Sequence, residues 1–229
     1  MIALRVVVFD LDDTLFPERD YVRSGFAALE DEVRRVFGAS AFGAVAWELF
    51  EAGVRGRIID AALARLGLPA DAATVGSLVD CYRRHRPSIG LYPDVAPVMR
   101  CLSGRVRAAI ISDGPLAAQQ RKVVALALDA WFDPILLTDR WGRDYWKPHE
   151  RAFREVEALT GSGGATCAYL GDNPQKDFAA PSRLGWRTVR VRRPGGEHAS
   201  VEGDGGAQME CTSLADAVQR LGFEVEEVR

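Results

Sequence analysis

Three carboxylates stand within four consecutive positions, directly after a short apolar run near the start of the chain. The run covers residues 5–9, and the carboxylates are Asp10, Asp12 and Asp13. Side chains two positions apart point the same way in an extended chain, so Asp10 and Asp12 can share one site while Asp13 should point elsewhere. Two converging carboxylates repel each other and attract a divalent cation. The pattern favours a metal-dependent reaction over a loop that merely caps the next helix.

Polar or charged residues follow three later apolar segments as well. They offer a hydroxyl and backbone N–H groups that suit an anion, a lysine ammonium group and further carboxylates. These residues are Ser112, Asp113 and Gly114, then Lys147, and then Asp172, Asn173 and Asp177. Each one alone is explained equally well as a cap, a turn or a surface charge. Together they favour one shared site, because parallel α/β sheets bind ligands at the carboxyl ends of their strands.

Short apolar runs and helical patterns alternate over most of the chain. Five runs predict buried strands, at residues 5–9, 106–111, 134–137, 165–170 and 187–191. Helical patterns cover residues 93–102, 116–128, 150–159, 175–184 and 213–221, the last with Ser213 as its N-cap. Residues 195–206 are rich in glycine but lack a GxGxxG pattern, and they predict an exposed loop. The alternation predicts an α/β fold, a doubly wound parallel sheet with helices on both faces.

One long stretch breaks this alternation. From residue 16 to residue 89 no segment has the pattern of a strand, and apolar residues recur at steps of four and three from Val22 to Val36. That spacing predicts an amphipathic helix, and three further helical patterns follow it. We therefore expect an α/β core made of residues 1–15 and 90–229, with residues 16–89 inserted after the first strand as an all-helical domain.

The composition is typical of a soluble globular protein. The 229 residues are 48% hydrophobic and 27% charged, and the net charge of −3 provides no basic excess for nucleic acid or an anionic membrane. No apolar run approaches the roughly 18 residues that span a bilayer, and the first apolar stretch is too short for a signal peptide. Four cysteines without CxxC spacing favour a reducing cytoplasm.

Lysine is scarce in this chain. The three lysines are Lys122, Lys147 and Lys176, against 26 arginines. In such an arginine-rich chain, a lysine placed after a predicted strand gives mild support to a specific role for Lys147.

The ordered set of polar residues resembles the four motifs of the haloacid dehalogenase-like (HAD) superfamily. An Asp-x-Asp pair alone is a weak signal, whereas four motifs in order across residues 10–177 are a strong one. The residues that carry the resemblance are Asp10, Asp12 and Thr14, then Ser112, then Lys147, and then Gly171, Asp172 and Asp177. The resemblance implies a Rossmann-like HAD core, and the inserted segment stands where members with a first-type helical cap carry that cap.

The same resemblance implies a phosphoryl-transfer reaction. Asp10 would be the nucleophile that forms an aspartyl-phosphate, and Asp12 would protonate the leaving alcohol and later activate water. A Mg²⁺ ion would be held by Asp10, by the backbone carbonyl of Asp12 and by Asp172.

The remaining motif residues would hold the phosphoryl group or support the site. Phosphoryl oxygens would be bound by the Ser112 hydroxyl, by backbone N–H groups of Asp113 and Gly114, and by Lys147. Asp177 would act behind the metal ligands or through a water molecule. Thr14 and Asn173 would support the surrounding loops.

Other reactions use parts of this pattern. Haloacid dehalogenases share the aspartate nucleophile, but the resemblance says that they lack an aspartate two residues later, so Asp12 favours phosphate chemistry. Phosphonate hydrolases of the superfamily use a cap lysine, and residues 16–89 contain no lysine. A two-component receiver domain has no large helical insert. A glycosyltransferase Asp-x-Asp site leaves Ser112 and Lys147 unexplained.

We therefore expect a cytoplasmic, Mg²⁺-dependent phosphomonoester hydrolase that acts on a small phosphorylated metabolite, with a sugar phosphate as one candidate. Neither nucleic acid nor a membrane is expected as a partner. Two alternatives stay open: a phosphosugar mutase of the same fold, and a catalytically silent or regulatory scaffold. The sequence does not distinguish a monomer from a homodimer. Substrate choice is expected to lie in the helical segment, acting as a mobile lid.

Overall fold

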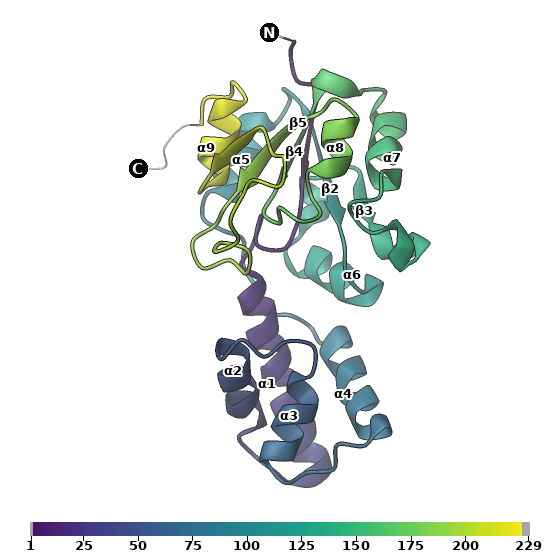
Figure 1. Ribbon diagram of the computed structural model, residues 1–229, viewed down its shortest axis with the longest axis vertical. Helices are drawn as coiled ribbons and strands as arrows, with labels where there is room; N and C mark the ends of the chain where they lie inside the picture. Colours follow the sequence, from purple (N-terminus) through teal and green to yellow (C-terminus); the bar gives the residue numbers. More distant parts are fainter. Residues whose placement is uncertain (1, 226–229) are drawn as a thin grey trace. The chain divides into compact units, whose positions relative to one another are not determined.

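A six-stranded parallel sheet forms the centre of the α/β unit (Figure 1). The structure is a computed structural model that describes residues 2–225. The strands are β1 (Val6–Phe9), β2 (Arg107–Ser112), β3 (Ile135–Leu137), β4 (Cys167–Gly171), β5 (Arg187–Val191) and β6 (Met209–Cys211). They are ordered β3-β2-β1-β4-β5-β6, and every neighbouring pair is parallel. The predicted doubly wound parallel sheet is confirmed.

Strand β1 lies at the middle of the sheet because its sequence is apolar on both faces. It consists of three valines and a phenylalanine, all of them buried. It pairs with β2 on one side and with β4 on the other, with Val6 opposite both Arg107 and Cys167. The chain runs outward in opposite directions from β1 and β4. Their carboxyl ends therefore flank the point where doubly wound sheets bind ligands.

Helices cover both faces of the sheet. Helices α5 (Val95–Leu102) and α9 (Leu214–Arg220) lie on one face, and α7 (Arg151–Thr160) and α8 (Ala179–Arg183) lie on the other (Figure 1). On the second face, Phe153 packs edge-on between Tyr169 and Trp186, with ring centres 5.1 and 5.5 Å away. Helix α6 (Leu116–Ala125) follows β2. The 3-10 helices are η1 (Leu128–Ala130), η2 (Thr138–Trp141), η3 (Arg143–Tyr145) and η4 (Gly164–Thr166).

Two predicted helices differ from their expected bounds by three residues or more at one end, and one strand was not predicted. The helix expected at residues 116–128 ends at Ala125. The helix expected at 175–184 covers only Ala179–Arg183, because Asn173 first closes a turn: its Oδ1 accepts a hydrogen bond from the N–H of Gln175 at 2.9 Å. Strand β6 has only three residues and was not predicted.

A second compact unit consists entirely of helices. One unit of the chain comprises Met1–Glu18 and Gly90–Arg229, and the other comprises Arg19–Ile89, three residues shorter than the predicted insert. Its helices are α1 (Glu18–Phe37), α2 (Phe42–Glu51), α3 (Ile58–Arg65) and α4 (Ala72–Arg84). This helical unit has its own apolar core, which includes Phe26, Leu29, Val33, Phe42 and Leu63.

The two ends of the helical unit are joined by polar contacts. The Ser24 hydroxyl accepts a hydrogen bond from the N–H of Ser88 at 2.8 Å and lies 3.2 Å from Nε2 of His85. Ser24 lies near the start of the unit and Ser88 near its end. The folded unit therefore brings its entry and exit segments together. Among residues 2–225, no helix combines the length and the apolar character that a membrane span requires.

Replacing Phe153 with alanine should destabilise the α/β unit by about 3–5 kcal/mol, because the side chain is fully buried and the cavity cannot close completely. A urea denaturation series measures this loss as a lower midpoint. Leu159→Ala on the same helix is the control, because Leu159 is 51% exposed and its truncation should change stability by less than about 0.5 kcal/mol. Equal losses in both variants would contradict this description of the core.

Candidate active site

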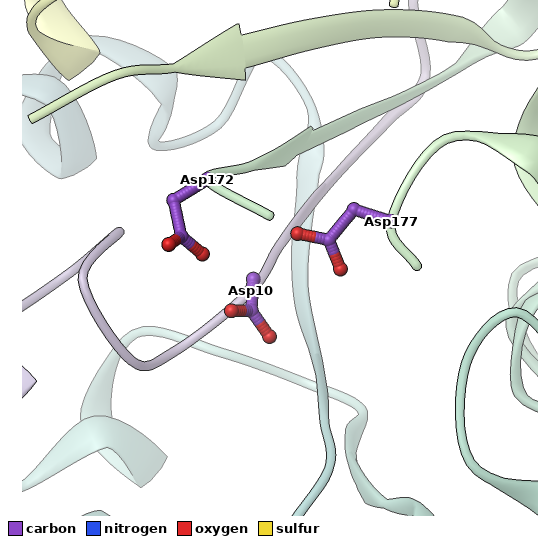
Figure 2. Close-up of side chains that lie close together, drawn as sticks. All are labelled: Asp10, Asp172 and Asp177. Carbon is purple, nitrogen blue, oxygen red and sulfur yellow. The ribbon is translucent and has the colours of Figure 1, made fainter. Parts of the chain in front are cut away.

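Three buried carboxylates gather at the carboxyl ends of β1 and β4. Asp10 follows β1, Asp172 follows β4, and Asp177 lies five residues further on (Figure 2). Each offers one oxygen, and these oxygens all lie within 4.8 Å of one another. Gly171, directly before Asp172, must be a glycine because a Cβ atom at this position would collide with Oδ2 of Asp177. The sequence thus allows Asp177 to approach the end of β4 closely.

Burial and mutual repulsion disfavour the charged forms of these acids. Burial raises the pKa of Asp10 to about 6, although the ammonium group of Lys147 acts in the opposite direction. Burial and the negative charges of Asp10 and Asp177 raise the pKa of Asp172 well above its usual range. The Asp172 carboxylate makes no hydrogen bond or ion pair with another described residue. It is the member of the cluster whose charge most needs a cation.

Lys147 lies between two members of the cluster. Its Nζ donates to Oδ1 of Asp10 at 2.5 Å and to the hydroxyl of Tyr169 at 2.8 Å, and it lies 2.8 Å from Oδ1 of Asp177. Burial acts to lower the pKa of Lys147, but Asp10 and Asp177 outweigh it and hold that pKa well above its usual value. The lysine therefore contributes a fixed positive charge next to Asp10.

The turn after β2 is held in place by Asp113. Its Oδ1 accepts hydrogen bonds from the hydroxyl of Thr138 at 2.7 Å and from the backbone N–H of Lys147 at 3.1 Å, and its Oδ2 lies 3.2 Å from Nζ of Lys176. Burial acts to raise the pKa of Asp113, but the two lysines and these hydrogen bonds lower it overall. Gly114 follows with φ +128°, a conformation that favours glycine.

The carboxylate of Asp12 is held away from the three-carboxylate cluster. Its Oδ1 accepts a hydrogen bond from Nζ of Lys122 at 2.6 Å, and its Oδ2 accepts one from Nε2 of Gln119 at 2.8 Å. The same nitrogen of Gln119 also donates to the hydroxyl of Ser112 at 2.6 Å and to the backbone carbonyl of Asp113 at 2.7 Å. Asp12 and Ser112 are therefore linked through one buried amide.

The remaining residues of the first motif face the surrounding loops. Asp13 accepts hydrogen bonds from the backbone N–H groups of Glu18 at 2.9 Å and Glu197 at 2.8 Å, so it points elsewhere as predicted. Thr14 is fully buried, and its hydroxyl has no hydrogen-bond partner in the described part of the chain. Its backbone carbonyl accepts from Nη2 of Arg193 at 3.1 Å.

The glycine-rich loop is mostly exposed, as predicted, but it is anchored to the site. Nε2 of His198 lies 2.9 Å from Nδ2 of Asn173. The buried Arg190 of β5 donates to the backbone carbonyls of Asp172 at 3.3 Å, His198 at 2.8 Å and Val201 at 3.0 Å. One arginine thus fastens this loop to the end of β4.

The structure brings most of the predicted residues together. Two of them, Asp177 and Asp12, have surroundings that differ from those expected. Asp177, expected behind the metal ligands, belongs to the carboxylate cluster itself. Asp12 was expected to bind metal through its backbone carbonyl, which stays a prediction, and its carboxylate lies with Gln119 and Lys122.

Sequence reasoning missed several residues that contact the predicted ones, among them Gln119, Lys122, Tyr169 and Lys176. The scarcity of lysine could have pointed to two of them, Lys122 and Lys176. All three lysines of the chain form ion pairs with aspartates of this site.

The donor set suits Mg²⁺. Carboxylate oxygens are the hard ligands that this ion prefers. Five aspartates, Asp10, Asp12, Asp113, Asp172 and Asp177, share this edge of the sheet with the three lysines. The carboxylates outnumber the ammonium groups, so a divalent cation would reduce their mutual repulsion.

Comparison with known proteins gives consistent matches. A family model described as haloacid dehalogenase-like hydrolase matches residues 4–185. A glyceraldehyde 3-phosphate phosphatase of Methanocaldococcus jannaschii is 23% identical over 94% of this chain and 96% of its own. A phosphoserine phosphatase of Thermus thermophilus is 30% identical over 61% of this chain and 55% of its own. The crystal structure of a 2-haloacid dehalogenase from Pseudomonas syringae, 21% identical, shares the fold, with a TM-score of 0.65 over 96% of this chain and 98% of that one.

Replacing Asp172 with asparagine should abolish stabilisation by Mg²⁺. A wild-type protein with the ion at one hundred times its Kd gains about 2.7 kcal/mol, whereas the variant lacks one ligand and one charge. Without metal, the variant should melt at or above the wild-type temperature, because a buried, unpaired charge is gone. Thermal melts with and without Mg²⁺ measure both effects. Asp129→Asn, at an exposed aspartate, is the control. Equal Mg²⁺ stabilisation of wild type and Asp172→Asn would exclude Asp172 as a ligand.

Proposed function

The chain belongs to the haloacid dehalogenase-like hydrolase family, and from that premise we propose that it is a Mg²⁺-dependent phosphomonoester hydrolase acting on a small phosphorylated metabolite. The observation that carries the proposal is the difference between the surroundings of Asp10 and those of Asp12. Asp10 lies in the carboxylate cluster beside Lys147, and Asp12 is held outside it by a separate lysine. This arrangement supports Asp10 as the nucleophile that attacks phosphorus and Asp12 as the group that moves a proton.

The reaction runs in two displacements at phosphorus. In the first, a carboxylate oxygen of Asp10 forms a bond to phosphorus, and the bond between phosphorus and the ester oxygen breaks. Asp12 gives its proton to that oxygen, which leaves as an alcohol. In the second, Asp12 takes a proton from water, whose oxygen attacks the aspartyl-phosphate. Inorganic phosphate leaves, and Asp10 is a free carboxylate again.

The surrounding residues lower the electrostatic cost of bringing an anion to Asp10. Asp10, Asp172 and the Asp12 carbonyl, with Asp177 adjacent, would hold Mg²⁺, which would neutralise part of the negative charge. Lys147 holds a positive charge where phosphoryl oxygens would bind.

The turn after β2 offers neutral donors to the same oxygens. They are the hydroxyl of Ser112 and the backbone N–H groups of Asp113 and Gly114. Donors that are already fixed need not reorganise when charge develops on the phosphoryl group.

Two features support a small substrate. The relative from Methanocaldococcus jannaschii, which aligns over nearly the whole chain, is named for a three-carbon sugar phosphate. The Thermus thermophilus relative is named for a phosphorylated amino acid. Short sugar phosphates and phosphoserine are therefore the first compounds to test. Separately, we propose that the activity is in the cytoplasm.

Wild-type protein with Mg²⁺ should release inorganic phosphate from one group in a panel of phosphorylated metabolites, and Asp10→Asn should release none. The variant removes the nucleophile but keeps the side-chain volume, so circular dichroism should show an intact fold. Asp129→Asn should match the wild type. Full turnover by Asp10→Asn would overturn the mechanism. Isomerisation of phosphosugars without phosphate release, followed by ³¹P NMR, would indicate a mutase instead. Neither reaction would indicate a silent scaffold.

A further inference from the structure

We propose that Gln119 and Lys122 are positioning residues that fix the carboxylate of Asp12 for its two proton transfers. The inference rests on the proposed function, because it assigns a task to these residues in that reaction. Neither residue follows a strand or belongs to a motif identified in the sequence. Both come from α6, which begins four residues after β2.

The two side chains hold different oxygens of one carboxylate. Gln119 and Lys122 are three positions apart, so they project from the same side of the helix. Nζ of Lys122 binds Oδ1 of Asp12 at 2.6 Å, and Nε2 of Gln119 binds Oδ2 at 2.8 Å. One hydrogen bond would leave the carboxylate plane free to rotate. Two bonds from a rigid helix fix both its position and its plane.

Burial strengthens the two hydrogen bonds that Gln119 and Lys122 donate to Asp12. The exposed fractions of Gln119 and Lys122 are 1% and 4%, whereas Gln120 and Arg121 between them are exposed. A charge-assisted hydrogen bond away from water is shorter and stronger than a neutral one. A long lysine side chain also loses rotamer freedom when it is ordered. The ion pair and hydrogen bonds to Asp12 help to offset the cost of burying both side chains.

Gln119 also joins Asp12 to the predicted phosphate-binding turn. Its amide nitrogen carries two hydrogens and lies within 2.8 Å of three acceptors, on Asp12, Ser112 and Asp113. Two hydrogens cannot serve three acceptors fully. The Ser112 hydroxyl can donate its own hydrogen to a phosphoryl oxygen while its oxygen still accepts from Gln119. The same amide would therefore contact both Asp12 and the phosphate-binding turn during the reaction.

Misplacing Asp12 has a recognisable kinetic signature. An alcohol leaves poorly as an alkoxide, so alkyl phosphates need the proton of Asp12 in the first step. The p-nitrophenolate ion leaves readily without a proton. Both substrates give the same aspartyl-phosphate, whose hydrolysis needs Asp12 as a base. In a variant with a misplaced Asp12, the first step should therefore become slower only for alkyl phosphates. The second step should become slower for both substrates.

The test compares Lys122→Met and Gln119→Met with two matched controls, Arg121→Met and Gln120→Met. Single turnovers of Lys122→Met with the best alkyl phosphate of the panel should be about 10²-fold slower, because proton transfer and its geometry contribute about that much. The first step with p-nitrophenyl phosphate should slow less than about 10-fold. Steady-state turnover should then show a burst of p-nitrophenol. Both controls should behave as wild type, and Lys122→Arg should recover part of the loss.

A double variant separates positioning from a general structural role. If Lys122 acts through Asp12, then Lys122→Met should cause no further loss in protein that already carries Asp12→Asn. A further loss of 10-fold or more in the single-turnover rate constant would show that Lys122 acts elsewhere.

The outcomes are distinguishable from failure of the proposed function. Equal losses for both substrates in the first step, or no loss, would overturn the positioning role while wild-type hydrolysis still stands. If wild-type protein hydrolyses no phosphomonoester, the proposed function and this inference fall together. If circular dichroism shows that Lys122→Met does not fold, Gln119→Met carries the same comparison, because its removal leaves the Lys122–Asp12 ion pair in place.

Discussion

Mutual repulsion among buried carboxylates is the constraint around which this site is built. Five aspartates share one edge of the sheet, and three lysines, the only ones in the chain, form ion pairs with four of them. The lysines come from α6, from the segment before α7 and from the turn after β4. Each lysine therefore ties one of these elements to the site. The fifth, Asp172, lacks such a partner, so the site as a whole favours a cation.

Much of the fold and site could be predicted because a parallel sheet converts sequence order into proximity. Each buried strand needs a continuous apolar run, and the next polar residue must lie at the carboxyl edge. Asp10, Ser112 and Asp172 could be found in this way. Lys147 stands ten residues after β3, and its rarity and the order of the motifs pointed to it instead. The helical unit was recognisable because its apolar residues recur at helical spacing over a long stretch without a strand pattern.

The rest depends on contacts that no local pattern encodes. Gln119 and Lys122 lie on a helix whose inward face becomes polar only where it meets Asp12. Tyr169 stands inside an apolar strand, so its sequence context indicates core packing and hides its hydroxyl contact with Lys147. The anchoring of the glycine-rich loop comes from Arg190, which is buried by strands paired far apart in sequence. Long-range tertiary contacts decided each of these positions.

The tie between Ser24 and Ser88 has a consequence for how the chain folds. Strand β1 must find β2 across 101 residues, from Val6 to Arg107. A helical unit that closes its own ends first removes the segment between Ser24 and Ser88 from that search. Because closure entropy grows with the logarithm of loop length, the saving is about 1 kcal/mol. The insertion that separates the central strands therefore also shortens the path between them, and early folding of the helical unit would speed assembly of the sheet.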